Sequence, residues 1–114
     1  MGNHWINETI HALQQAGIPT RRGLPAGKIP YIDGAVAAVC IEKMEAALVT
    51  LAVHIFSPAA LGGAACEDAA LQASRAMVPL GGIYQIQAAE FDEKSSLFRM
   101  KVLVTFSRVY DLIE

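Results

Sequence analysis

The sequence predicts an α+β fold in which two helices pack on a mostly antiparallel, four-stranded sheet. Hydrophobic periodicity changes along the chain in the order helix, strand, strand, helix, strand, strand. Two pairs of neighbouring strands that flank a helix favour hairpins, and hairpins build an antiparallel sheet that helices cover on one face. The length of 114 residues and the lack of an internal repeat predict a single domain over residues 1–114, with an extended arm at about residues 18–30.

The N-terminal segment predicts an amphipathic helix followed by this arm. A helix over residues 3–16 places four apolar side chains on one face, and Gly17 and Pro19 favour its end. Residues 18–30 contain three prolines and two glycines, so regular structure is not expected there. Prolines stiffen a connecting segment, which favours an extended arm over a flexible linker. The apolar helix face consists of Trp5, Ile6, Ile10 and Leu13.

The next segment predicts two strands joined by a turn. A strand starts at about residue 31 with apolar residues on both faces, and the charged run at residues 42–45 is the expected turn. In the second strand, over residues 46–56, the even positions carry Thr50 and His54, whereas the odd positions are entirely apolar. The odd face, expected to lie in the core, consists of Val49, Leu51, Val53 and Ile55.

The second half predicts a helix and two closing strands. Gly62 and Gly63 allow a sharp entry into a helix over about residues 64–78, and the sequence after it favours a stop at Pro79. A strand over residues 83–90, a polar loop over 92–96 and a strand over 97–109 follow, the last with clear alternation. The expected inner stripe of the helix is Cys66, Ala69, Ala70, Ala73 and Met77.

The composition favours self-association over binding to nucleic acid or membrane. Apolar residues make up 54% of the chain and charged residues only 18%, against roughly 25% charged in an average soluble domain. Such an excess can fill a core or form a subunit interface, and the interface is favoured because a small domain needs more polar cover than this chain offers. The net charge is −2 and the basic residues are scattered, which argues against a nucleic-acid partner. The longest apolar stretch, residues 46–56, is too short to span a bilayer, so no membrane partner is expected.

Few residues are candidates for chemistry. Cys40 and Cys66 lie among small apolar residues and are expected to be reduced, buried thiols. His54 has no acid or nucleophile fixed near it by spacing, and the histidines of the first predicted helix have no third ligand nearby. We therefore expect no catalytic residue, no cofactor and no metal site. One alternative remains open: a small enzyme or ligand-binding domain with a pocket near His54, Cys66 and Tyr84.

Two stretches resemble small neck and tail proteins of long-tailed phages and prophages. The first is Leu-Ala-Val-His-Ile-Phe-Ser-Pro at residues 51–58, followed by Gly-Gly-Ala-Ala-Cys-Glu at residues 62–67. The second is Ala-Ala-Glu-Phe-Asp-Glu-Lys-Ser-Ser-Leu-Phe-Arg-Met-Lys-Val-Leu-Val-Thr-Phe at residues 88–106. Over roughly residues 35–106 the chain is most similar to the tail terminator group, which has the minor tail protein U-like fold. Another tail or head-completion protein is the open alternative.

The resemblance implies a structural function. It implies a leading helix, a sheet, a second helix against the sheet and a closing hairpin. It further implies a homo-oligomer, a hexameric ring that ends the tail tube and contacts the head connector, without enzymatic activity or cofactor. Such a protein resides in the virion, or in the bacterial cytoplasm during assembly. In this setting the arm residues Arg21, Arg22 and Lys28 are candidates for contact with Asp92 and Glu93 in the adjacent copy.

Overall fold

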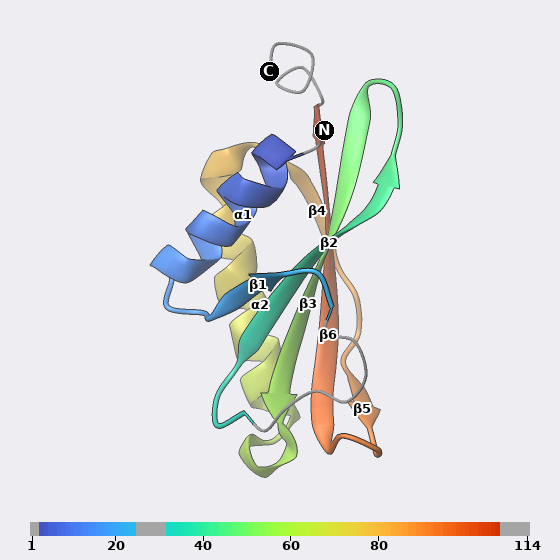
Figure 1. The fold of residues 1–114 in the computed structure, drawn as a ribbon. Coiled ribbons are helices and arrows are strands. Elements are labelled where there is room, and N and C mark those ends of the chain that lie inside the picture. The colour runs from blue at the N-terminus through green and yellow to red at the C-terminus, as the bar shows by residue number, and fades with distance from the viewer. Residues whose placement is uncertain (1–2, 25–31, 108–114) are drawn as a thin grey trace.

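The computed structural model describes residues 3–24 and 32–107, which form one sheet with two helices on one of its faces (Figure 1). The first helix is α1 (Asn3–Gln15) and the second is α2 (Gly63–Met77). Short 3-10 turns lie on either side of α2, namely η1 (Ala59–Leu61) and η2 (Val78–Leu80). The strands are β1 (Thr20–Arg22), β2 (Val36–Met44), β3 (Leu48–Pro58), β4 (Ile83–Ile86), β5 (Glu90–Asp92) and β6 (Leu97–Ser107).

The α+β class is confirmed, but the sheet is larger and more mixed than the sequence predicts. Its six described strands run in the spatial order β1-β2-β3-β6-β4, and β5 pairs with the other end of β6 on the same side as β4. The pairing of β1 with β2 is parallel, whereas the other pairs are antiparallel. The prediction of four largely antiparallel strands was therefore wrong in number and in one pairing.

Two local differences account for the extra strands, and a third makes β2 longer than expected. Residues 20–22 of the expected arm form β1, because Ala37 donates its N–H to Pro19 at 2.8 Å and Gly23 donates to Val39 at 2.8 Å. The charged run at residues 42–45 is not the turn: β2 continues to Met44 through a bulge between Ile41 and Lys43. The single strand expected over residues 83–90 is split into β4 and β5. The second of these continues to Asp92, which was expected to begin the polar loop. Residues 25–30 of the arm and 108–109 of the last expected strand lie outside the described residues.

The main core lies between the two helices and one face of the sheet. The odd positions of β3 are fully buried there, as the alternation predicts. The predicted inner stripe of α2 is also confirmed, since all five of its residues are buried. In α1, Trp5, Ile6 and Leu13 are buried, whereas Ile10 is only partly covered. Trp5 holds α1 on β6: its ring stacks on Phe106 with centroids 4.3 Å apart, and its indole N–H donates to the Ser107 carbonyl at 2.6 Å.

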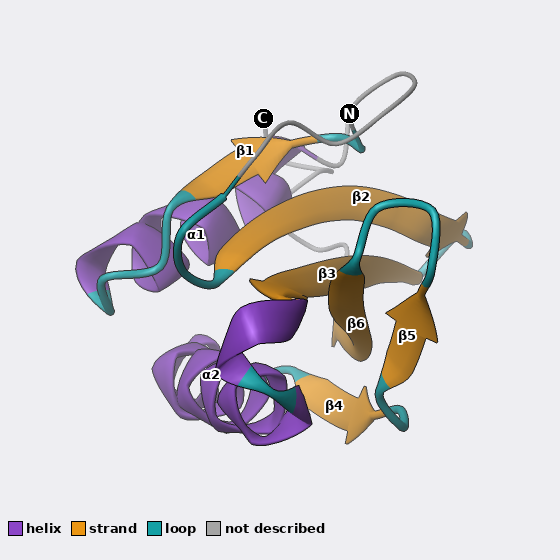
Figure 2. Ribbon diagram, turned by 90° about the horizontal axis from the view of Figure 1, so that it is seen from below, coloured by secondary structure: helices purple, strands orange, loops and turns teal. Residues whose placement is uncertain are grey.

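The opposite face of the sheet has no helix over it in the described structure, and we call it the open face (Figure 2). A small second cluster of buried apolar side chains, Ala38, Phe56 and Leu97, lies at one end of this face. The rest of the face is more polar and includes Thr50 and His54 of β3. The hydroxyls of Thr50 and Thr105 are 3.0 Å apart across the strand pair. The open face and the edges of the sheet are therefore the parts of the sheet that no described helix covers.

Candidate functional site

The densest group of charged side chains on the open face surrounds the middle of β6. Arg99 and Lys101 are two residues apart on one strand and thus project from the same face. Lys101 Nζ donates to Glu42 Oε1 at 3.0 Å, so this pair joins β6 to β2 across β3. Arg99 Nη2 lies 3.5 Å from Glu90 Oε2 on β5. Both cations therefore already have a carboxylate partner within the chain.

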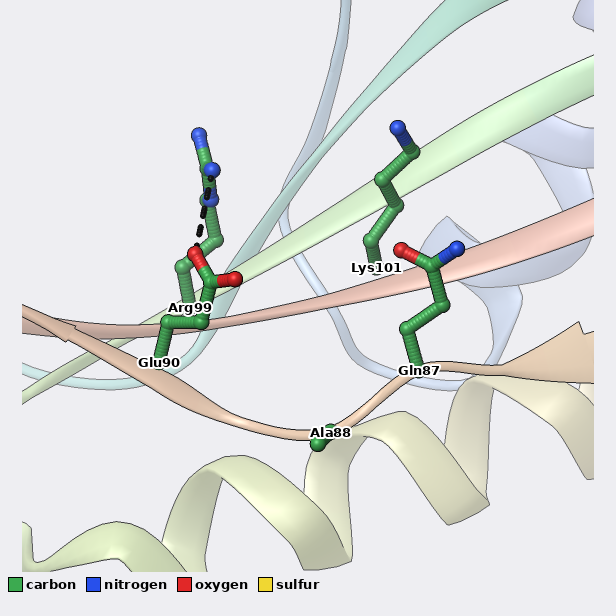
Figure 3. A pocket seen from close by; sticks show the side chains of 5 residues that line it. All are labelled: Gln87, Ala88, Glu90, Arg99 and Lys101. Carbon is green, nitrogen blue, oxygen red and sulfur yellow. Dashed lines mark ion pairs between the residues drawn. The ribbon is translucent and has the colours of Figure 1, made fainter.

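A shallow recess of about 240 Å³ lies where the chain leaves the sheet between β4 and β5 (Figure 3). Its walls are the side chains of Arg99 and Lys101 on one side and the segment from Gln87 to Glu90 on the other. Gln87 still holds this segment to β6, because its N–H donates to the Lys101 carbonyl at 2.9 Å. The recess could admit a small polar group, but an acidic ligand would compete with Glu90 and Glu42 for the two cations.

His54 is buried on the open face, between Ala38 of β2 and Lys101 of β6. Burial lowers the pKa of its imidazole, and the positive charges of Arg99 and Lys101 lower it further, whereas Glu42 partly opposes them. The ring stacks loosely on Phe56 with centroids 6.3 Å apart, and Nδ1 has no hydrogen-bond partner in the described structure. His54 is thus a neutral, packed side chain near neutral pH. No described carboxylate accepts a hydrogen bond from its Nδ1.

The structure does not bring His54, Cys66 and Tyr84 into one pocket. Cys66 lies on the helix side of the sheet, where its thiol is 3.7 Å from the Ile55 carbonyl and burial raises its pKa. His54 precedes Ile55 and therefore points to the opposite face of β3. Tyr84 lies on β4, at the edge of the sheet, opposite Val104 of β6. The three side chains thus have no common cavity.

The prediction of two buried thiols holds for Cys66 but was wrong for Cys40, which is partly exposed. The reason is local. Cys40 lies on the open face of β2 just beyond Val39, the last residue that β1 covers. Sequence alternation alone suggested cover on both faces, but it could not show how far the neighbouring strand extends.

The residues predicted for subunit contacts lie on opposite sides of the sheet. Arg21 and Arg22 are exposed on β1, at the first edge. Asp92 ends β5 and Glu93 begins the following turn, and both are exposed on the side of β6 away from β3. Asp92 accepts hydrogen bonds from Ser95 Oγ at 2.7 Å and from the Lys94 N–H at 3.2 Å, and the Ser95 bond contributes most to lowering its pKa. Lys28 lies outside the described residues.

The sequence analysis missed the exposed apolar side chains at the two edges of the sheet. One group lies on β4, where Ile83 is 80% exposed and Tyr84 is 43% exposed. The other lies around the end of the β2–β3 hairpin and consists of Ile41, Met44 and Leu48. The signal for the first group was present: Ile-Tyr-Gln-Ile is an uncharged strand without proline or bulge, which is unusual for an edge strand.

No group of three or more His, Cys, Asp or Glu side chains in the described structure is placed to hold a metal ion. The described helices also include none that is long and apolar enough to cross a lipid bilayer. Comparison with known proteins adds no family: no family model, no curated protein and no solved structure matches the chain. The inference of function therefore rests on the residues, on the geometry and on the resemblance noted in the sequence.

Proposed function

We propose that this protein is a ring-forming structural subunit of a phage or prophage tail, acting as the terminator that caps the tail tube and joins it to the head connector. The observation that carries the proposal is the exposure of large apolar side chains on both edges of one sheet. A protein that worked as an isolated monomer would leave Ile83, Tyr84, Ile41 and Met44 in water. Two separate apolar edges are instead typical of a subunit with a neighbour on each side.

Three further features support the proposal. The leading helix, the β2–β3 hairpin, α2 against the sheet and the closing strands agree with the element order that the resemblance implies. The β2–β3 hairpin extends past the helical layer, which makes its tip accessible to a neighbour (Figure 1). Basic Arg21 and Arg22 lie at one side of the sheet, and acidic Asp92 and Glu93 lie at the other. When identically oriented copies lie side by side, the basic side of one therefore faces the acidic side of the next.

The alternative of a small enzyme or ligand-binding domain has less support. It relied on a pocket shared by His54, Cys66 and Tyr84, and these residues lie on different faces and at different depths of the sheet. The recess beside Arg99 and Lys101 is shallow, and both cations have partners. We therefore retain the structural function as the conclusion, with the virion as the proposed location.

The test is the state of the purified full chain. We expect light scattering coupled to size exclusion to give a mass of six subunits, and negative-stain electron microscopy to show a six-fold ring. The tail-tube and head-connector proteins encoded with it should bind opposite faces of that ring. A chain that stays monomeric across the accessible concentration range, or that forms only a two-fold dimer, would contradict the proposal.

A further inference from the structure

Besides the outer sides of β1 and β5, two stretches of strand have no strand beside them in the described structure. One is β4, which pairs only with β6. The other is the end of β2 from Cys40 to Met44, because β1 pairs only with residues 37–39 and Gly23 then takes the Val39 carbonyl. We call these stretches the β4 edge (residues 83–86) and the β2 edge (residues 40–44). They lie on opposite sides of the same sheet.

The main-chain groups of both edges point outward at matching positions. Ala37 donates its N–H outward to Pro19 and Val39 accepts outward from Gly23, so by alternation Ile41 directs its own N–H and C=O outward. On the other side, Gln87 donates inward to Lys101, so Gln85 also faces β6, whereas Tyr84 and Ile86 direct their groups outward. Unpaired main-chain donors and acceptors of this kind are templates for a further strand.

The two edges also lie at the same level along the strands. Reading across the sheet, Ile41 pairs with Leu51, Leu51 with Val104, and Val104 with Tyr84. The row beside it runs Cys40, Ala52, Leu103, Gln85. Because β2, β3, β6 and β4 alternate in direction, the β4 edge of one copy and the β2 edge of an identically oriented neighbour run antiparallel.

We infer that the β2 edge of one copy adds as an antiparallel strand to the β4 edge of the next, so that the sheets of neighbouring subunits join head to tail. This inference rests on the proposed ring function and specifies its interface. If the neighbouring sheets join with these rows of residues at the same level, Ile41 and the neighbour's Tyr84 form a hydrogen-bonded pair on the helix side. Cys40 and the neighbour's Gln85 form the adjacent non-hydrogen-bonded pair on the open face, where side chains approach more closely.

The side chains suit this contact. Ile41, which is 41% exposed, would meet the neighbour's Tyr84, which is 43% exposed, because both side chains lie on the helix side of their sheets. The β4 edge carries no charge. The charged groups of the β2 edge already have partners in their own chain, since Glu42 binds Lys101 at 3.0 Å and Lys43 lies 3.5 Å from Glu45. Pairing the edges therefore brings no like charges together.

A two-fold pairing of β4 with a second β4 fits the molecule less well. It would bury Ile83 and Tyr84 of both copies, but it would leave the apolar side chains of both β2 edges in water. The head-to-tail contact covers both edges of every copy. A contact between two different surfaces closes into a ring when its rotation permits, whereas a two-fold contact ends at a dimer.

A disulfide test can show which residues meet. In the Gln85→Cys variant, mild oxidation should link the new thiol to the native Cys40 of the neighbour and give a non-reducing ladder that ends at the ring size. The matched control is Tyr84→Cys, whose side chain points to the other face and should give no ladder. The ladder should also disappear from Gln85→Cys when Cys40 is replaced by Ser. Absence of a ladder from a Gln85→Cys protein that forms rings would overturn the inference.

A second pair of variants tests the edge without a cross-link. Tyr84→Lys should reduce assembly at least about tenfold, because it places a charge against the neighbour's apolar Ile41. Leu61→Lys makes the same replacement at a side chain in η1 that is 53% exposed and outside both edges, and it should assemble as the unmodified chain does. Circular dichroism verifies that both variants are folded.

The outcomes separate the interface from the function. Normal rings in Tyr84→Lys would overturn the edge pairing and leave the ring function standing. A specific ladder from open filaments instead of rings would support the pairing and contradict the terminator function. An unmodified chain that is only monomeric would contradict both.

Discussion

The two faces of the sheet are built from the same strands but have different surroundings. On the helix side, Val49, Leu51, Val53 and Ile55 of β3 are fully buried against α1 and α2. On the open face, the intervening positions of the same strand include Thr50 and His54; Ala52, His54 and Phe56 are buried there, but no described helix lies over them. Alternation thus separates two tasks along one strand: the helix side stabilises the fold, and the open face and edges remain for contacts.

The largest expected effect comes from a deletion on the helix side. Leu51→Ala should lower the free energy of unfolding by about 2–5 kcal/mol, because it leaves a cavity in a fully packed layer. The matched change on the open face is Leu103→Ala. Leu103 is a partly exposed residue of β6 that pairs with Ala52, the neighbour of Leu51 on β3. It should cost less than Leu51→Ala, about 1–2 kcal/mol, because part of this side chain already lies in water. Urea denaturation measures both, and equal losses would contradict the division between the faces.

The next effect concerns an added methyl group on the helix side. A Cβ on Gly82 would lie 2.5 Å from Phe106 Cε1 and 2.7 Å from Val104 Cγ2. Phe106 is stacked on Trp5 and has little freedom to move away, so Gly82→Ala should cost about 1–3 kcal/mol. Gly34→Ala is the control, since nothing lies within 4 Å of its added Cβ. This control should be neutral or slightly stabilising in the same thermal melt. An unchanged melting temperature in Gly82→Ala would show that β4 can move away from β6.

His54 gives the open face a dependence of stability on pH. Its folded pKa is below the ordinary value of 6.5, mainly through burial and then through Arg99 and Lys101. Between the folded pKa and 6.5 the unfolded chain binds more protons than the folded one, so stability decreases as pH falls through this window. His54→Gln should flatten that part of the curve, whereas Asp92, with its pKa lowered from 3.8, acts only in a more acidic window. Urea midpoints between pH 5 and 8 test this, and an identical slope in the variant would exclude His54 as the cause.

The sequence predicted best what the periodicity of side chains determines. The buried face of β3, the alternation along β6 and the small-residue stripe of α2 all followed from spacing. It failed where main-chain bonding decides: β1 has three residues and no apolar pattern, and only its hydrogen bonds to β2 make it a strand. The length of β2 was underestimated for a related reason, because a bulge carries the strand through charged residues that resemble a turn.

The candidate site was less predictable than the fold. The separation of His54 from Cys66 agrees with the patterns, since the even positions of β3 lie opposite its core face and Cys66 lies on the inner stripe of α2, but the position of Tyr84 depends on strand order. The two edges with exposed apolar side chains depend on strand order, which joins β6 to β3 and leaves β4 outermost. Strand order is a property of the whole chain, so local patterns left both edges unrecognised.

The smallest effect compares the two thiols, one on each face. Cys66 is fully buried, and burial raises its pKa, which lowers the fraction of reactive thiolate. Cys40 is partly exposed on the open face at the start of the β2 edge. A thiol reagent should therefore modify Cys40 in the folded, unassembled chain and reach Cys66 only after unfolding. Mass spectrometry of the Cys40→Ser and Cys66→Ala variants assigns the two rates, and in urea the rates should become similar.

Assembly sharpens this last comparison. If the β2 edge pairs with the β4 edge of a neighbour, Cys40 is protected in the assembled chain and becomes reactive in the Tyr84→Lys variant, whereas Cys66 remains slow in both. Reaction of Cys66 at the same rate as Cys40 in the folded protein would mean that α2 opens readily from the sheet. In that case the helix side would not be the rigid layer on which the contact between edges depends.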